Sequence, residues 1–275
     1  MARIGSTGAG VNIDHGVVTT VAVRKGLKPR VSVMLNGRRL VNAVVSERVI
    51  TEYLLLYREP WTVKVDHRCD LPVGRGYGTS GAGAASLTLA LNDALGNPLG
   101  RIAAFSVAHK AEVKARTGLG TVAAVSEGGL AVRVKPGAPG IGEVRKLSVP
   151  ESLRVVSGSF GPIPTVTILS SRSLRHRVNV CSRRLVENLL KRPDERNFLR
   201  LSRSFADCLC LGSRRVGRVL ALADRHGVVA SMMMLGDGVF SLVPSDSVQV
   251  VAGLMRSTGF STISSRIYSR GAHLV

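Results

Sequence analysis

Short runs of β-branched and apolar residues alternate with turn residues through the first 66 positions of the chain. Residues 11–23, 29–45 and 61–66 have the composition of β-strands, and Asn36-Gly37 is typical of a hairpin turn. We expect these strands to form an antiparallel sheet.

A helical pattern replaces the strand pattern after residue 81. Residues 82–95 are rich in helix formers and end before a glycine and a proline, and residues 102–116 form a second predicted helix. Residues 121–134 predict a short helix of small residues, a glycine turn and a strand.

Residues 136–142 concentrate glycine and proline, so we expect two domains, residues 1–140 and residues 141–275. The second half mixes strand and helix patterns, which favours helices packed on an antiparallel sheet, an α+β fold. Its predicted strands are residues 146–149, 166–169, 230–236, 238–243 and 261–269. Its predicted helices are two within residues 183–210, broken near Pro193, and two more at residues 216–227 and 245–259.

Charge and composition narrow the class of protein. No run of about 18 apolar residues and no secretory signal is visible, so we expect a soluble, cytoplasmic protein without a membrane partner. The net charge of +20 attracts polyanions, but only 4% of residues are aromatic, and few rings lie near the basic clusters to stack on bases. We favour a solvated basic face that attracts small anions, with nucleic-acid binding as the alternative.

The four cysteines, Cys69, Cys181, Cys208 and Cys210, include no CxxC pair. Their spacing matches neither a zinc site nor a disulfide framework. We therefore interpret them as buried thiols.

Residues 72–85 form a loop rich in glycine and serine that runs directly into a predicted helix. Its GYGTSG segment matches G-x-G-x-x-G, but the acidic residue about 20 positions later and the second strand of a dinucleotide-binding fold are missing. The Gly-Lys-Ser/Thr ending of a P-loop is also missing. Glycines still let backbone N–H groups approach phosphate at a helix N-terminus, whereas the alternative is a tight turn that only packs helix to sheet. The predicted phosphate-binding residues are Gly74, Gly76, Gly78, Thr79, Ser80, Gly81 and Ala82.

Four segments together resemble one family. Residues 71–92 are similar to the second motif of the galactokinase, homoserine kinase, mevalonate kinase and phosphomevalonate kinase (GHMP) superfamily. Residues 5–21, 108–129 and 230–243 resemble its archaeal pantoate kinase branch, and the last of them occupies the place of the third motif. The resemblance implies an α+β GHMP kinase fold, with an amino-terminal ATP-binding domain related to a ribosomal-protein fold and a carboxy-terminal ferredoxin-like domain.

The resemblance also implies an activity. It implies phosphorylation of the pantoate 4-hydroxyl by ATP and Mg²⁺, giving 4-phosphopantoate for coenzyme A biosynthesis, and it raises the expectation of a homodimer. One alternative is a kinase for another hydroxy acid, such as homoserine or a mevalonate relative. The other is a degenerate member that binds nucleotide or RNA without turnover.

By matching position, Ser80 and Glu112 are the predicted catalytic residues and the predicted Mg²⁺ ligands. A hydroxyl and a carboxylate suit a hard cation beside phosphate. His109 lies three residues before Glu112, and therefore on the same helix face. The predicted substrate-binding residues are Ser6, His109, Arg133 and Thr165.

The chain departs from the family at two places. TGLGT puts Thr121 where the family has an aspartate, and threonine cannot act as a base; Asp14 or Asp237 could replace it. The family also has a Pro-Gly-His strand upstream of the first glycine loop, whereas this chain begins almost at that loop. We expect either a start further upstream or a missing edge strand that a partner covers.

Overall fold

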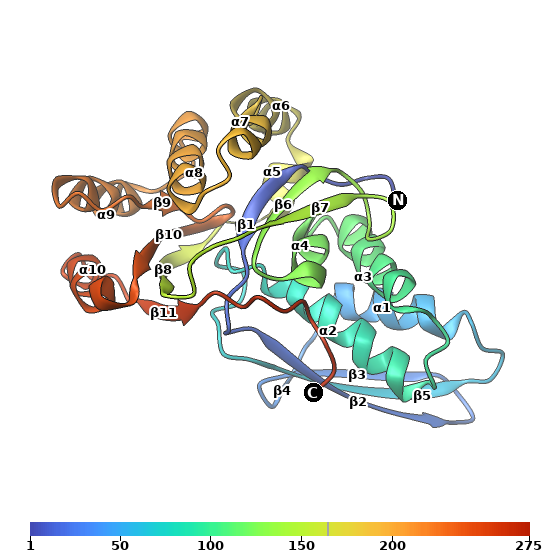
Figure 1. The fold of residues 1–275 in the computed structure, drawn as a ribbon. Helices are drawn as coiled ribbons and strands as arrows, with labels where there is room; N and C mark the ends of the chain where they lie inside the picture. Colours follow the sequence, from blue (N-terminus) through green and yellow to red (C-terminus); the bar gives the residue numbers. More distant parts are fainter. Residues whose placement is uncertain (164) are drawn as a thin grey trace.

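The computed structural model describes residues 1–163 and 165–275, and it contains three β-sheets with helices between and around them (Figure 1). The first sheet has the order β2-β5-β3-β4. Its strands are β2 (Val17–Lys25), β5 (Trp61–Cys69), β3 (Arg30–Leu35) and β4 (Arg38–Arg39). Strand β5 pairs antiparallel with β2 but parallel with β3, so the expectation of a purely antiparallel sheet was wrong.

Helix α1 (Val44–Leu54) explains the parallel pair, because it carries the chain back across the sheet between β4 and β5. Its first residues were predicted as the end of a strand. Val49, Ile50 and Tyr53 recur at helical spacing and are buried in the core beneath the sheet, and this packing decides the helix.

Helices α2 (Thr79–Ala94) and α3 (Arg101–Ala115) confirm the two helices predicted in this region. They lie with α1 between the first sheet and the second, as Figure 1 shows. Small residues such as Ala84, Ala85 and Ala108 are buried where these helices meet, and their size lets the helices approach closely.

The second sheet has the order β1-β6-β7, from β1 (Gly8–Val11), β6 (Leu130–Lys135) and β7 (Glu143–Leu147). Helix α4 (Thr121–Glu127) precedes β6. Strands β6 and β7 lie on either side of the predicted boundary at residues 136–142 and pair antiparallel, so that segment is a turn within one sheet. The division into domains 1–140 and 141–275 stays a prediction.

The third sheet is antiparallel, with the order β11-β8-β10-β9. Its strands are β11 (Ile263–Arg266), β8 (Leu153–Pro162), β10 (Gly236–Pro244) and β9 (Ser231–Met232). A short helix η1 (Ser245–Ser247) leads into α10 (Val248–Arg256), which together with α9 (Arg214–Arg225) packs on this sheet around a core that includes Val219 and Met255.

Helices α5 (Thr165–Ser170), α6 (Arg172–Cys181), α7 (Leu185–Lys191) and α8 (Glu195–Leu209) connect β8 to α9. The predicted break near Pro193 is confirmed, because the Asp194 side chain accepts a hydrogen bond from the Asn197 N–H and caps α8. The strand predicted at residues 166–169 was wrong, because these residues belong to α5. A four-residue apolar run has no periodicity that separates strand from helix.

The cysteines differ from the prediction of four buried thiols. Cys181 on α6 and Cys208 on α8 form a disulfide with a Cα–Cα distance of 5.7 Å, Cys210 is exposed and Cys69 is buried. The pairing depends on how α6 packs against α8, and no cysteine spacing encodes that.

The C-terminal segment returns to the first half of the chain. The Tyr268 N–H donates to the Asn12 carbonyl (2.9 Å), and the Ala272 N–H donates to the Val125 carbonyl (2.9 Å). Leu130 of β6 shares a buried cluster with Leu242 of β10, so the two halves also share a core. No helix within residues 1–163 and 165–275 has the length and apolar character needed to cross a membrane.

Candidate active site

A cavity of about 1810 Å³ lies between the glycine loop, the second sheet and helices α5 to α8. All predicted site residues except His109 line it. The cavity therefore joins residues from both halves of the chain.

The glycine loop ends at the N-terminus of α2. Gly74, Gly76 and Gly78 adopt positive φ angles of 75°, 90° and 70°, which glycine tolerates without strain. Gly78 is the N-cap and no side chain caps the helix; the N–H groups of residues 79–81 precede the Ala82 N–H, which donates to the Gly78 carbonyl. Free N–H groups and the helix dipole create an anion-binding position here.

Glu112 on α3 is buried with 2% of its surface exposed, directly beside this helix terminus. Its Oε1 accepts hydrogen bonds from Ser80 Oγ (2.6 Å) and Thr117 Oγ1 (2.8 Å). Burial raises the pKa of the Glu112 carboxyl above its ordinary value, and the two hydroxyl donors oppose that rise. Hydroxyl groups, and no cationic side chain among the described residues, donate to this carboxylate, so its negative charge is not balanced.

Two glycines leave space beside this carboxylate. A Cβ on Gly81 would lie 2.9 Å from Glu112 Oε2 and 2.6 Å from Thr121 Cβ, and a Cβ on Gly118 would overlap the carboxylate itself. Oε2 therefore lies where only glycines leave room beside it. Thr117 is the residue that sequence reasoning missed; its signal was its place in the TGLG segment directly after the α3 helix.

Thr121 begins α4 and packs its methyl group against the glycine loop, 2.9 Å from the position of a Cβ on Gly78. Neither proposed replacement for the family aspartate has a free carboxylate. Asp14 is ion-paired to Arg266 at 2.9 Å, and Asp237 accepts a hydrogen bond from the Ser213 N–H at 2.9 Å.

Arg133 projects from β6 into the cavity on the side of the first glycine loop. Its Nε donates to the Ser6 carbonyl (3.1 Å), and its Nη2 lies 2.9 Å from the position of a Cβ on Gly8. Burial lowers the pKa of Arg133 to about 10. No carboxylate among the described residues forms an ion pair with this guanidinium, so its remaining donors are available to an anion.

His109 is placed differently from the other predicted site residues. It is 1% exposed, and its Nε2 donates to the Ile4 carbonyl at 2.7 Å. Burial lowers its pKa, which favours the neutral ring. His109 lies on the same face of α3 as Glu112, but its ring contacts the N-terminal segment and does not line the cavity. The hydrogen bond to Ile4 therefore supports the segment that carries Ser6.

The segment that resembles the third motif, residues 230–243, forms a further part of the cavity wall. A Cβ on Gly76 would lie 2.9 Å from Gly236 Cα and 3.2 Å from Met233 Cβ, so the turn before β10 packs directly on the glycine loop. Thr165, at the start of α5, also lines the cavity.

Known proteins match this chain over most of its length. Residues 42–129 match the model of the GHMP kinases N terminal domain. A pantoate kinase from Thermococcus kodakarensis is 32% identical over 92% of this chain and 84% of its own. A second, from Methanospirillum hungatei, is 30% identical over 86% of this chain and 78% of its own.

A solved structure described as a phosphotransferase related to the CoA biosynthesis pathway superposes with a TM-score of 0.87. It is 30% identical in sequence, and the match covers 98% of this chain and 90% of the other. The two proteins therefore share the same fold over nearly the whole of this chain. With the sequence matches, this likeness shows that the chain belongs to the pantoate kinase family of the GHMP kinases.

Proposed function

We propose that this protein transfers the γ-phosphoryl group of ATP to the 4-hydroxyl of pantoate and forms 4-phosphopantoate, a precursor of coenzyme A. The observation that carries the proposal is one cavity with two poles. One pole is the uncapped N-terminus of α2 beside Glu112, and the other is Arg133, which has no ion-pair partner among the described residues. Two pantoate kinase relatives match 92% and 86% of this chain, which supports the same activity.

ATP and Mg²⁺ fit the first pole. The glycine loop and the N–H groups at the start of α2 would hold the phosphates through the backbone. Ser80 and Glu112 would hold Mg²⁺, because Glu112 is a buried carboxylate with only hydroxyl donors. No cluster of three or more metal-ligating side chains occurs among the described residues, which suits an ion that takes its other ligands from phosphate and water. When bound, the ion neutralises charge on the phosphates.

Pantoate fits the second pole through its carboxylate. A partly buried guanidinium that forms no ion pair within the described part of the chain can donate two parallel hydrogen bonds to a carboxylate, and the reduced dielectric strengthens them. Ser6 lies beside Arg133, and Thr165 lines the same cavity. We propose that these three residues orient pantoate so that its 4-hydroxyl faces the phosphates.

Transfer depends on positioning and charge rather than on a protein base. Thr121 stands in place of the family aspartate, and Asp14 and Asp237 are engaged elsewhere. Phosphoryl transfer has a loose transition state in most analyses, so a poorly deprotonated hydroxyl still reacts when it is held in line. A missing general base commonly lowers the rate by about 10²- to 10⁴-fold, and we expect modest turnover.

The test is to incubate the protein with ATP and Mg²⁺ and with pantoate, homoserine or mevalonate separately, and to follow products by ³¹P NMR. We expect a phosphomonoester from pantoate alone. Turnover of homoserine instead would assign the other hydroxy-acid activity. Salt-dependent RNA binding without ATP consumption would support the non-enzymatic alternative. No phosphorylated product from any acceptor would overturn the proposal.

An Arg133→Lys variant tests the substrate pole separately. Lysine keeps the charge but cannot donate two parallel hydrogen bonds. We expect KM for pantoate to rise by roughly 10- to 100-fold, the range of one charge-assisted hydrogen bond, with KM for ATP unchanged. Equal changes in both constants would contradict the assignment of Arg133 to the acceptor.

A further inference from the structure

Helix α6 is a wall of the cavity that contributes nothing to the core. None of its ten residues is buried. Arg175, Val178 and Asn179, followed by Ser182 just after the helix, nevertheless line the cavity. These positions are three, four and seven residues after the first of them and therefore share one helix face. The wall is thus held without the apolar burial that usually anchors a helix.

Covalent attachment takes the place of that burial. The Cys181–Cys208 disulfide joins the C-terminal end of α6 to α8, and Arg177 Nη2 donates to the Leu209 carbonyl (2.6 Å) at the same end. The opposite end of α6 continues through the N-cap Ser171 into α5, whose first residue is Thr165. The position of Thr165 in the cavity is therefore coupled to the attachment of α6.

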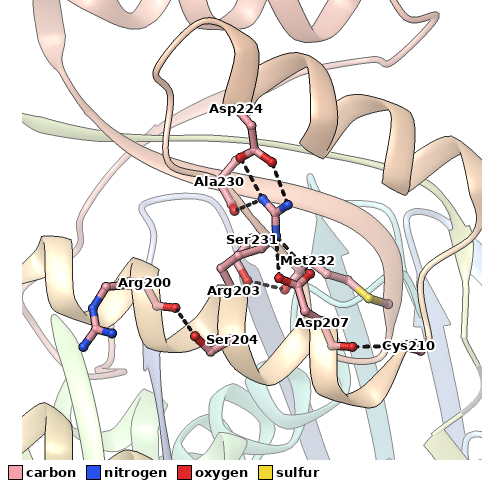
Figure 2. Close-up of polar contacts among 9 residues, drawn as sticks. All are labelled: Arg200, Arg203, Ser204, Asp207, Cys210, Asp224, Ala230, Ser231 and Met232. Atoms are coloured by element: carbon pink, nitrogen blue, oxygen red, sulfur yellow. Dashed lines mark hydrogen bonds and ion pairs between the residues drawn. The ribbon is translucent and has the colours of Figure 1, made fainter.

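Helix α8 is the fixed side of this cross-link. Phe198, Leu201 and Leu209 of α8 are buried. Figure 2 shows the Arg203 guanidinium between two carboxylates, with hydrogen bonds to Asp207 on α8 (3.0 and 3.1 Å) and to Asp224 on α9 (3.1 and 2.8 Å). Arg203 also donates to the Ala230 carbonyl (3.3 Å), next to β9. Loss of the disulfide would leave α6 with only non-covalent contacts to α8, whereas α8 would stay in place.

The disulfide is open to a reductant. Cys208 is exposed and Cys181 is half-buried. The disulfide therefore includes a residue at the protein surface, and access of a thiolate to the sulfur is what thiol–disulfide exchange requires. Cys210, two residues further on, is a second exposed sulfur and remains a free thiol.

We propose that the Cys181–Cys208 disulfide is a reversible redox control on the cavity wall formed by α6. A dithiol reductant attacks the Cys208 sulfur, the S–S bond breaks, and Cys181 leaves as a thiolate that takes a proton. The second thiol of the reductant displaces Cys208 and closes a disulfide in the reductant. Two electrons and two protons pass to the protein, and α6 loses its covalent attachment.

Reduction loosens α5 and α6 and weakens binding of the acceptor. The kinetic part rests on the proposed function, so the experiment has a structural readout as well. We compare oxidised protein with protein treated with dithiothreitol, and measure hydrogen exchange in residues 165–182 and the KM for pantoate. We expect faster exchange in that segment and a rise in KM of about tenfold, both reversed by oxidised glutathione.

Serine variants separate the disulfide from other effects of the reductant. Cys181→Ser should behave as reduced protein with and without dithiothreitol. Cys210→Ser is the matched control, because it keeps the disulfide and should retain the full response to dithiothreitol. It also removes the exposed free thiol, so that alkylation counts the thiols that reduction releases from Cys181 and Cys208. Exchange in α2 and α3 reports whether the core stays folded.

Three results would overturn the proposal. They are equal exchange in residues 165–182 before and after complete reduction, the absence of the disulfide by mass spectrometry of the oxidised protein, and global unfolding on reduction. Global unfolding on reduction would show that the disulfide stabilises the whole fold and does not control the cavity wall. Loss of all kinase activity in both forms would contradict the proposed function, whereas the exchange measurement would still decide the redox control.

Discussion

The buried carboxylate of Glu112 accepts hydrogen bonds only from hydroxyls among the residues that the structure describes. A carboxylate at 2% exposure is costly to keep charged, which is why its pKa is raised. Such a group lowers the stability of the empty protein and is stabilised when a cation arrives. Charged groups at binding sites commonly lower the stability of the empty protein while they favour binding of the ligand.

The variant Glu112→Gln tests whether the charge of Glu112 lowers stability and promotes turnover. Glutamine keeps the shape and an acceptor oxygen for Ser80 but removes the charge. We expect kcat/KM to fall by about 10²-fold or more, since electrostatic groups at reacting phosphates commonly contribute that much. The melting temperature without Mg²⁺ should be equal or higher, and Mg²⁺-ATP should raise it only in the wild type. Undiminished turnover would show that the metal lies elsewhere.

His109 predicts a pH dependence of stability. Its folded-state pKa lies below the ordinary 6.5, so the unfolded state binds more protons as the pH falls below 6.5. The stabilisation is therefore present above pH 6.5 and is lost as the pH falls through the folded pKa. His67, whose pKa burial also lowers, adds to the effect.

The measurement is urea denaturation of wild type and His109→Gln between pH 7.5 and about 5, where histidines change charge. Glutamine can still donate to the Ile4 carbonyl but does not titrate. We expect the stability of the variant to fall less steeply with acid. Parallel curves for the two proteins would contradict the buried neutral ring.

At the scale of elements, the N-terminus of α2 determines how closely Glu112 and Thr121 can approach the glycine loop. Its glycines serve different purposes although they are close in sequence. A Cβ on Gly81 would meet Thr121 and Glu112 at under 3 Å, whereas a Cβ on Gly83 would meet only Val17 Cγ1 at 4.0 Å. The first glycine makes room for the carboxylate, and the second has no steric reason to be glycine.

Gly81→Ala and Gly83→Ala form a matched pair. We expect Gly81→Ala to displace Glu112 or Thr121, with a loss of about 1–3 kcal/mol in stability from overpacking and of about 10²-fold in kcat/KM from misplacement. Gly83→Ala should leave activity unchanged and stabilise α2 by about 0.5–1 kcal/mol. Calorimetry and steady-state kinetics of both variants provide the check; equal kinetics would refute the assigned role of Gly81.

At the scale of the whole molecule, the two halves are joined by more than the cavity. The core cluster containing Leu130 and Leu242 crosses between them, and the C-terminal segment bonds to the region around α4 and β1. Arg101 Nη2 also donates to the Ala272 carbonyl (2.5 Å). We therefore expect one cooperative unfolding transition rather than two.

Removal of residues 267–275 tests this joining. The truncation deletes the hydrogen bonds of Tyr268 and Ala272, each contributing about 1 kcal/mol, and we expect the melting temperature to fall by roughly 5 °C or more. Removal of only Leu274 and Val275, both exposed, is the control and should leave stability unchanged. Two separate transitions in the wild type would show that the halves unfold independently.

The elements closest to the candidate site were predictable from local spacing. The α2 and α3 helices follow from their composition and helix-ending residues, and the Ser80–Glu112 juxtaposition followed from the family resemblance of the two segments. The break at Pro193 also follows from local chemistry, because proline cannot continue a helix. A homodimer and a cytoplasmic location stay predictions, and nucleic-acid binding stays the less favoured alternative.

The tertiary structure alone decided which distant groups meet. The parallel pairing of β3 with β5, the Cys181–Cys208 bond and the donation from His109 to Ile4 each join residues whose approach depends on the packing of other elements. The sequence by itself determined the glycine loop that we propose binds phosphate, because glycine spacing before a helix acts locally. Burial determined the rest, because the environment of Glu112 and Arg133 exists only once the sheets and helices have closed around them.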